Sequence, residues 1–142
     1  MSIDVIRLLL DFGLVVLIWI IQRIVYPIFL HYNTGNLVVS HKLYTSRFSA
    51  IVIPLMLGQL VIAIYQAIIL SSLYTFMSLG VILLIWISTF LQFVPIHANI
   101  SKGIVSEKML VSLVQKNWIR TVLWTLLFLY SFFNTSIKGY AS

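Results

Sequence analysis

Polar side chains stand at the end of a long apolar run in the stretch QFVPIHANI, residues 92–100. Histidine can act as a general base near neutral pH, and the amides of glutamine and asparagine can hold a ligand by hydrogen bonds. Such groups are not tolerated in hydrocarbon without partners. Gln92, His97 and Asn99 therefore predict a polar pocket.

Two further stretches carry related chemistry, HKLYTSRF at residues 41–48 and QKNWIRTV at residues 115–122. An arginine in an apolar setting either reaches out to lipid phosphates or presents a fork of donors to an anion. In an enzyme, His41 or His97 would act as the base, and the arginines would stabilise a developing oxyanion. The residues expected to bind the ligand are Tyr44, Arg47, Gln92, Asn99, Asn117 and Arg120.

The histidines also suggest haem or a metal, because neutral imidazole is the commonest metal ligand in proteins. The chain has no cysteine, and its three histidines show no HxxxH or HxxEH spacing. A histidine near a helix end also suits the helix dipole without any ligand. Both readings stay open, and no residue is assigned as a metal ligand.

The elements that position these residues follow from composition. Of the 142 residues, 61% are hydrophobic and 8% are charged, and the mean hydropathy is +1.08. A bilayer-spanning helix needs about 20 apolar residues, and four segments qualify: Val5 to Leu30, Ser49 to Leu70, Tyr74 to Val94 and Val111 to Phe133. The prediction is an all-α integral membrane protein, a four-transmembrane-helix bundle forming one domain over residues 1–142.

The basic residues predict a topology. Seven of the nine Lys and Arg residues flank the first and third connections, and only Arg7 and Lys138 fall on the other side. By the positive-inside rule, both long loops face the cytoplasm and both termini lie outside, in a multi-pass protein of the bacterial inner membrane. The net charge of +6 then reflects topology and contact with anionic lipid, and no nucleic-acid partner is expected.

The two halves resemble one another. WIIQRIVYPIFLH (19–31) and WISTFLQFVPIH (86–97) each lead from a tryptophan to a Pro-Ile pair and a histidine. The pattern favours two duplicated helical hairpins, and common membrane-boundary chemistry is the alternative. Most polar residues are expected at the cytoplasmic ends under the two loops, and the outer half is expected to hold only Asp11, paired with Arg7, and a few Ser and Thr.

A resemblance supports a more specific prediction. VPIHANISKG and LVQKNWIRTVLW in the second half, and YPIFLHYN and SHKLYTSRFSAIVIPLMLGQL in the first, resemble small bacterial four-helix membrane proteins of the anthrone oxygenase-like family. That resemblance implies cofactor-free oxidation of a lipophilic polycyclic aromatic compound. A weaker similarity, an aromatic-Pro helix end followed by a His/Tyr/Arg helix start, is to the haem-binding protoporphyrinogen oxidase and copper-resistance membrane families.

Three functions follow as expectations. The first is an integral membrane protein that binds, and in the enzymatic version oxidises, a lipophilic, partly anionic small molecule at the cytoplasmic end of the bundle. The second is a non-catalytic oligomeric or accessory membrane subunit, and a homo-oligomer is compatible with both the first and the second function. The third is a haem- or metal-binding redox protein.

Overall fold

The structure is a computed structural model that describes residues 2–141, with side chains as far as residue 137. The described residues are almost all helical and include no strand. The elements are α1 (Ile3–Ile20), η1 (Ile21–Val25), α2 (Tyr26–Phe29), α3 (Thr34–Leu70), α4 (Leu73–Ser88), η2 (Thr89–Phe93), α5 (Val94–Ser101) and α6 (Glu107–Ala141). Because α1–η1–α2 and α4–η2–α5 are continuous, the chain forms four long helices, as the composition predicted.

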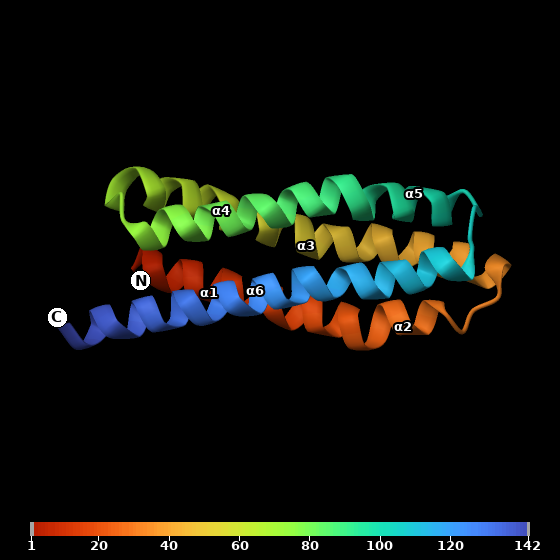
Figure 1. Cartoon of the computed structure of the whole chain (residues 1–142), viewed down its shortest axis with the longest axis horizontal. Helices are drawn as coiled ribbons and strands as arrows, with labels where there is room; N and C mark the ends of the chain where they lie inside the picture. The colour runs from red at the N-terminus through yellow and green to blue at the C-terminus, as the bar shows by residue number, and fades with distance from the viewer. Residues whose placement is uncertain (1, 142) are drawn as a thin grey trace.

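The four helices run up and down beside one another (Figure 1). In addition, α1 packs along both α3 and α6, and α4 packs along the same two helices. Both termini and the α3–α4 connection lie at one end, here called the terminal end, and residues 30–33 and 102–106 lie at the other, the loop end (Figure 1). Lys138, counted above with the terminal end, lies outside the described side chains.

The connections at the loop end are shorter than expected. The Asn33 side chain accepts a hydrogen bond from the Asn36 amide at 2.9 Å, so α3 begins at residue 34 and not near Ser49. After α5, Gly103 adopts a φ of +77° and its amide donates to the Ile100 carbonyl. Together with a bond from the Ile104 amide to the Asn99 carbonyl, this forms a Schellman motif. The prediction of two long loops over the pocket is therefore wrong, because most of the residues assigned to those loops are helical.

Two π-helical segments, η1 and η2, each end just before a proline. The Tyr26 amide donates to the Ile21 carbonyl before Pro27, and the Val94 amide donates to the Thr89 carbonyl before Pro95. Proline has no amide hydrogen to donate, and its ring collides with the preceding turn of a regular α-helix. One wider, π-helical turn before the proline removes that collision. The same device at the same place in both halves fits the repeat read from the sequence.

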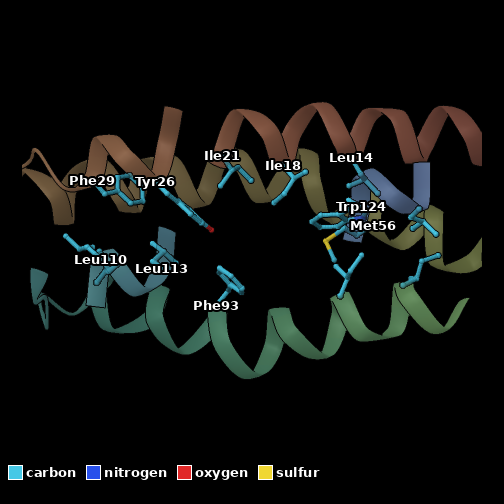
Figure 2. Close-up of a cluster of buried hydrophobic side chains, with 14 of the residues drawn as sticks. Leu14, Ile18, Ile21, Tyr26, Phe29, Met56, Phe93, Leu110, Leu113 and Trp124 are labelled. Carbon is cyan, nitrogen blue, oxygen red and sulfur yellow. The ribbon is translucent and has the colours of Figure 1, made fainter. Parts of the chain in front are cut away.

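The interior and the surface differ in an unusual way. A cluster of buried apolar side chains runs along the axis, including Leu14, Ile18, Met56, Phe93 and Trp124 (Figure 2). Many large apolar side chains are nevertheless exposed, while several polar and charged ones are buried. Two helices, Thr34–Leu70 and Leu73–Ser101, are long and apolar enough to cross a membrane.

Candidate functional site

The two histidines predicted to act as bases lie against each other at the loop end. His41 of α3 is fully buried and His97 of α5 is partly buried, and the His41 Nε2 and His97 Nδ1 atoms are 2.7 Å apart. Their rings stack with centroids 4.9 Å apart. The hydrogen bond joins residues 56 positions apart in the chain. It therefore depends on the packing of α3 against α5.

The hydrogen bonds continue on both sides of this pair. The Tyr26 hydroxyl of α2 lies 3.1 Å from His97 Nε2, and the Ser101 hydroxyl of α5 lies 3.3 Å from His41 Nδ1. The result is a chain of four side chains, Tyr26, His97, His41 and Ser101, here called the relay. Three helical segments contribute to it, and α6 contributes the residue that stands behind it.

That residue is Arg120, which is 5% exposed. Its guanidinium lies 4.2 Å from the centre of the Phe93 ring and 5.2 Å from that of Trp124, and it interacts electrostatically with the hydroxyls of Tyr26 and Tyr44. Its Nε atom is buried with no hydrogen-bond partner among the described residues. Aromatic faces attract the cation but do not neutralise its charge.

Among the described residues, no carboxylate lies beside Arg120. The only acidic residues of the chain are Asp4, Asp11 and Glu107. Asp4 and Asp11 belong to α1 at the terminal end, and Glu107 is exposed in the first turn of α6. Arg120 follows Glu107 by thirteen positions along α6, which is about 20 Å at 1.5 Å per residue. Arg120 is therefore a buried cation without a counter-ion in the part of the chain that the structure describes.

A shallow groove of about 500 Å³ leads to the histidines from the surface. It runs between α3 and α5, and His97 and Ser101 line it. The other lining residues are short or β-branched: Thr45, Ser46, Ser49, Val94 and Ala98. Two members of the relay therefore border a space that a ligand can enter.

The relay does not fit a metal or a haem iron. All four ring nitrogens of His41 and His97 have hydrogen-bond partners, and two of them bond to each other at 2.7 Å. A metal–imidazole bond is about 2.0–2.1 Å long for zinc, so two nitrogens on one tetrahedral zinc ion would lie roughly 3.3 Å apart. Among the described residues, no three His, Asp or Glu side chains gather as metal ligands would.

The middle of the bundle holds a second polar group, in which Asn117 has a structural partner. The Asn117 Nδ2 atom donates to Gln22 Oε1 at 2.9 Å, and Gln22 Nε2 donates to the Val114 carbonyl at 3.2 Å. Thr121 also donates to Gln22 Oε1. The predicted ligand residue Asn117 thus ties α6 to η1, and its Oδ1 is buried without a described partner.

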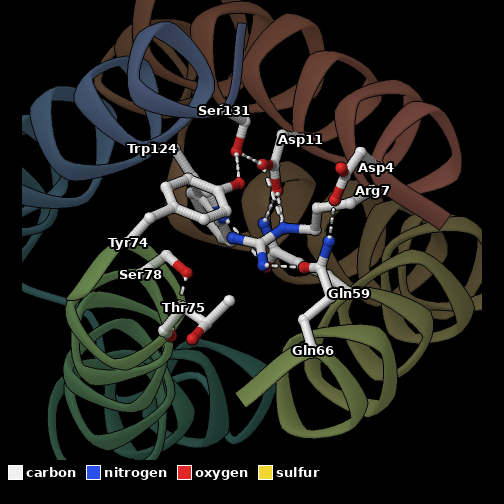
Figure 3. Close-up of polar contacts among 10 residues, drawn as sticks. All are labelled: Asp4, Arg7, Asp11, Gln59, Gln66, Tyr74, Thr75, Ser78, Trp124 and Ser131. Carbon is white, nitrogen blue, oxygen red and sulfur yellow. Dashed lines mark hydrogen bonds and ion pairs between the residues drawn. The ribbon is translucent and has the colours of Figure 1, made fainter. Parts of the chain in front are cut away.

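The terminal end holds the largest buried polar network, contrary to expectation. The Arg7 Nε atom donates to both carboxylate oxygens of Asp11, at 2.9 and 3.0 Å, and Asp11 also accepts hydrogen bonds from Gln59, at 2.6 Å, and from Ser131 (Figure 3). Gln66 bridges Arg7 and Asp4. The pairing of Asp11 with Arg7 is confirmed, but the prediction that the outer half holds little else is wrong.

The remaining predicted ligand residues lie at the edge of the site or away from it. Tyr44 is half-buried and its ring packs on Phe29 at 5.7 Å. Gln92 and Asn99 are half-buried, and neither side chain has a hydrogen bond among those described for residues 2–137. Arg47 is exposed and lines a separate surface hollow between turns of α3.

The chain was compared with protein-family models, with curated proteins and with solved structures. None of them matches. The resemblances described from sequence motifs therefore stay predictions, and the functional argument rests on the geometry of this chain.

Sequence reasoning missed two members of the site, Tyr26 as a partner of His97 and Ser101 altogether. Ser101 follows His97 by four residues, a spacing that places two side chains on one face of a helix. The sequence indicated Tyr26 less strongly. Its one signal is its position directly before Pro27, which matches the position of Val94 before Pro95. Neither signal identifies the partner helix, which depends on tertiary packing.

Proposed function

We propose that this chain is a multi-pass integral membrane protein whose four helices all cross the bilayer. Two helices qualify by length and apolar composition, and in their most apolar windows only 17% of the residues are buried. A core helix of a soluble protein would be mostly buried instead. The other two helices lie alongside these along the bundle (Figure 1), so a membrane that encloses one pair also encloses the other.

The arrangement of polar groups supports the same proposal. Arg7, Asp11, Gln59, Gln66 and Asn117 are all at most 1% exposed, while the outer surface presents large apolar side chains. In a bilayer, polar side chains must find partners inside the protein, since lipid tails offer none. In the proposed topology the loop end faces the cytoplasm and the terminal end faces outward.

We further propose that the protein binds a lipophilic molecule with an anionic oxygen in the groove between α3 and α5. The single observation that carries this proposal is Arg120, buried without a carboxylate and connected to that groove through Tyr26 and His97. Burying an uncompensated charge costs several kcal/mol, which a ligand anion nearby would offset in part. An apolar ligand body would lie between the helices, in contact with lipid.

This proposal is narrower than the pocket predicted from sequence. Asn117 is engaged by Gln22, and Arg47 is exposed, so neither belongs to the proposed site. His97 contacts the groove directly, and Arg120 acts from behind it as a fixed positive charge. The oxidative chemistry implied by the anthrone oxygenase-like resemblance has no observation of its own here, and the proposal is one of binding.

Binding of two matched probes to the detergent-solubilised protein tests it. The fatty acid palmitate carries a carboxylate, and hexadecanol has the same chain length without a charge. Palmitate is expected to bind at least tenfold more tightly, a difference of about 1.4 kcal/mol. Arg120→Met is expected to remove that preference, because the buried positive charge is lost.

Arg47→Met is the matched control, since it removes an exposed arginine from the same end of the bundle. The preference for palmitate should survive in this variant. Equal binding of the two probes by the unmodified protein, or the same loss in both variants, would contradict the proposed site. Circular dichroism and thermal unfolding in detergent establish that each variant is folded.

A further inference from the structure

Every hydrogen bond of the relay can run in either of two directions. In one direction Tyr26 donates to His97, His97 to His41, and His41 to Ser101. In the other, Ser101 donates to His41, His41 to His97, and His97 to the Tyr26 oxygen. Each neutral imidazole has one N–H and one bare nitrogen. The direction of the hydrogen bond at either end of the relay therefore fixes the tautomers of both histidines.

Arg120 makes that choice. A guanidinium has donors only, so it interacts with the lone pairs of the Tyr26 oxygen and repels the hydroxyl proton. The Tyr26 proton then turns toward His97 Nε2, which is 3.1 Å away. In the opposite direction this proton would have no acceptor among the described residues. Tyr26 is only 2% exposed, so its hydroxyl has little access to bulk water.

We propose that Arg120 orients the whole relay, so that both histidines carry their proton on Nδ1 and Ser101 presents its hydroxyl hydrogen to the ligand. His97 Nδ1–H then donates to His41 Nε2, and His41 Nδ1–H donates to the Ser101 oxygen. With its oxygen already accepting a hydrogen bond, Ser101 acts as a donor to the groove that it lines.

This inference deepens the proposed function and rests on it for the role of Ser101. It identifies the ligand atom as a hydrogen-bond acceptor, such as a carboxylate or phenolate oxygen, and Ser101 as the residue that contacts it. Tyr26, His97 and His41 are positioning residues that transmit the orientation set by Arg120. Each aligned dipole in such a chain strengthens the next one.

The tautomers are tested by NMR of protein labelled with ¹⁵N at histidine, in detergent micelles. Two-bond ¹H–¹⁵N correlations distinguish the protonated ring nitrogen from the bare one. Both His41 and His97 are expected as Nδ1–H tautomers. A predominant Nε2–H tautomer at either histidine would overturn the proposed orientation.

Three variants show whether Arg120 is the cause. Arg120→Met is expected to give a mixture of tautomers at His97, and Tyr26→Phe is expected to do the same while keeping the aromatic ring. Thr121→Val is the control, because it removes a buried hydroxyl next to Arg120 that is outside the relay. If Arg120→Met does not fold, Tyr26→Phe alone decides; unchanged tautomers in a folded Tyr26→Phe protein would overturn the proposal.

Palmitate binding then tests Ser101. Ser101→Ala is expected to weaken palmitate binding about tenfold, as for loss of a hydrogen bond to a charged group. Ser49→Ala, in the same groove, is expected to change it less than twofold, since the Ser49 hydroxyl already donates to the Ser46 carbonyl. Equal effects would overturn the role of Ser101. Failure of palmitate to bind the unmodified protein would instead overturn the proposed function, and the tautomer result would stand on its own.

Discussion

The two buried arginines of this bundle have opposite surroundings. Arg7 has Asp11 at 2.9 Å, with Gln66 as a further partner. Arg120 has aromatic rings and hydroxyls around it and no carboxylate partner among the described residues. A buried arginine that is paired with a carboxylate has a structural role, whereas a buried arginine without one can bind an anion from outside the chain. This contrast distinguishes the two ends of the molecule at the scale of single residues.

The Arg7–Asp11 pair yields the first stability prediction. Arg7→Met leaves Asp11 buried beside Gln59 and Ser131 without its cation, and should cost about 3–5 kcal/mol of unfolding free energy. Adding Asp11→Asn should recover at least half of this loss, because the neutral amide no longer needs a counter-charge. Unfolding titrations in mixed detergent micelles measure both variants. A double variant no more stable than Arg7→Met would show that the charges are not what holds this end together.

The residue types indicated which histidines lie near each other. His41 and His97 were placed in one pocket, and they are in direct contact. The stretches HKLYTSRF and QKNWIRTV gave Arg47 and Arg120 the same predicted role, but only Arg120 is buried. At about 100° per residue, Arg47 lies six positions and roughly 240° around the helix from His41, so it faces outward. Helical phase was therefore the stronger guide, and it was available from the sequence.

At the scale of elements, the π-helical segments set the helical phase of the site. Each adds one residue to a helix just before proline, so the residues beyond are rotated relative to a regular α-helix. η2 contributes Phe93 beneath Arg120, and His97 follows it by one turn. Composition predicted four helices, but hydropathy placed the start of α3 near Ser49. Residues 34–48 fall outside the apolar window because polar and basic residues such as Asn36, Lys42 and Arg47 interrupt them.

A single-residue deletion tests the role of η2. Deleting the exposed Leu91 together with Pro95→Ala should turn η2 into regular α-helix and leave His97 facing His41, at a cost below about 2 kcal/mol. Deleting the exposed Leu84 from the regular helix α4 should rotate every later residue by about 100° and separate the histidines. The NMR signals of the histidine pair report both outcomes. If both deletions separate the two histidines to the same extent, the assignment of a one-residue insertion in η2 is wrong.

At the scale of the whole molecule, the bundle carries its polar groups inside and its apolar groups outside. The relay lies toward the loop end with Arg120 behind it, and a buried network around Arg7 and Asp11 occupies the terminal end (Figure 3). Apolar side chains that include Leu14, Ile18 and Met56 lie along the interior between them (Figure 2). Sequence composition predicted this class of architecture. It could not predict which polar residues pair, because pairs such as Ser131 and Asp11 join helices far apart in the chain.

The proposed topology is testable because the chain has no cysteine of its own. Ile104→Cys and Leu73→Cys place a thiol at the loop end and at the terminal end, on side chains that are 61% and 76% exposed. A membrane-impermeant maleimide should label Leu73→Cys in intact cells and Ile104→Cys only after lysis. The reverse pattern would place the loop end outside.

The central claim is that the loop end holds a lipophilic acidic ligand against the relay. Native mass spectrometry of the protein released from mild detergent tests it most directly. We expect a stoichiometric added mass that disappears in Arg120→Met and persists in Arg47→Met. A bare protein mass, with only scattered lipid adducts in all three samples, would contradict the claim.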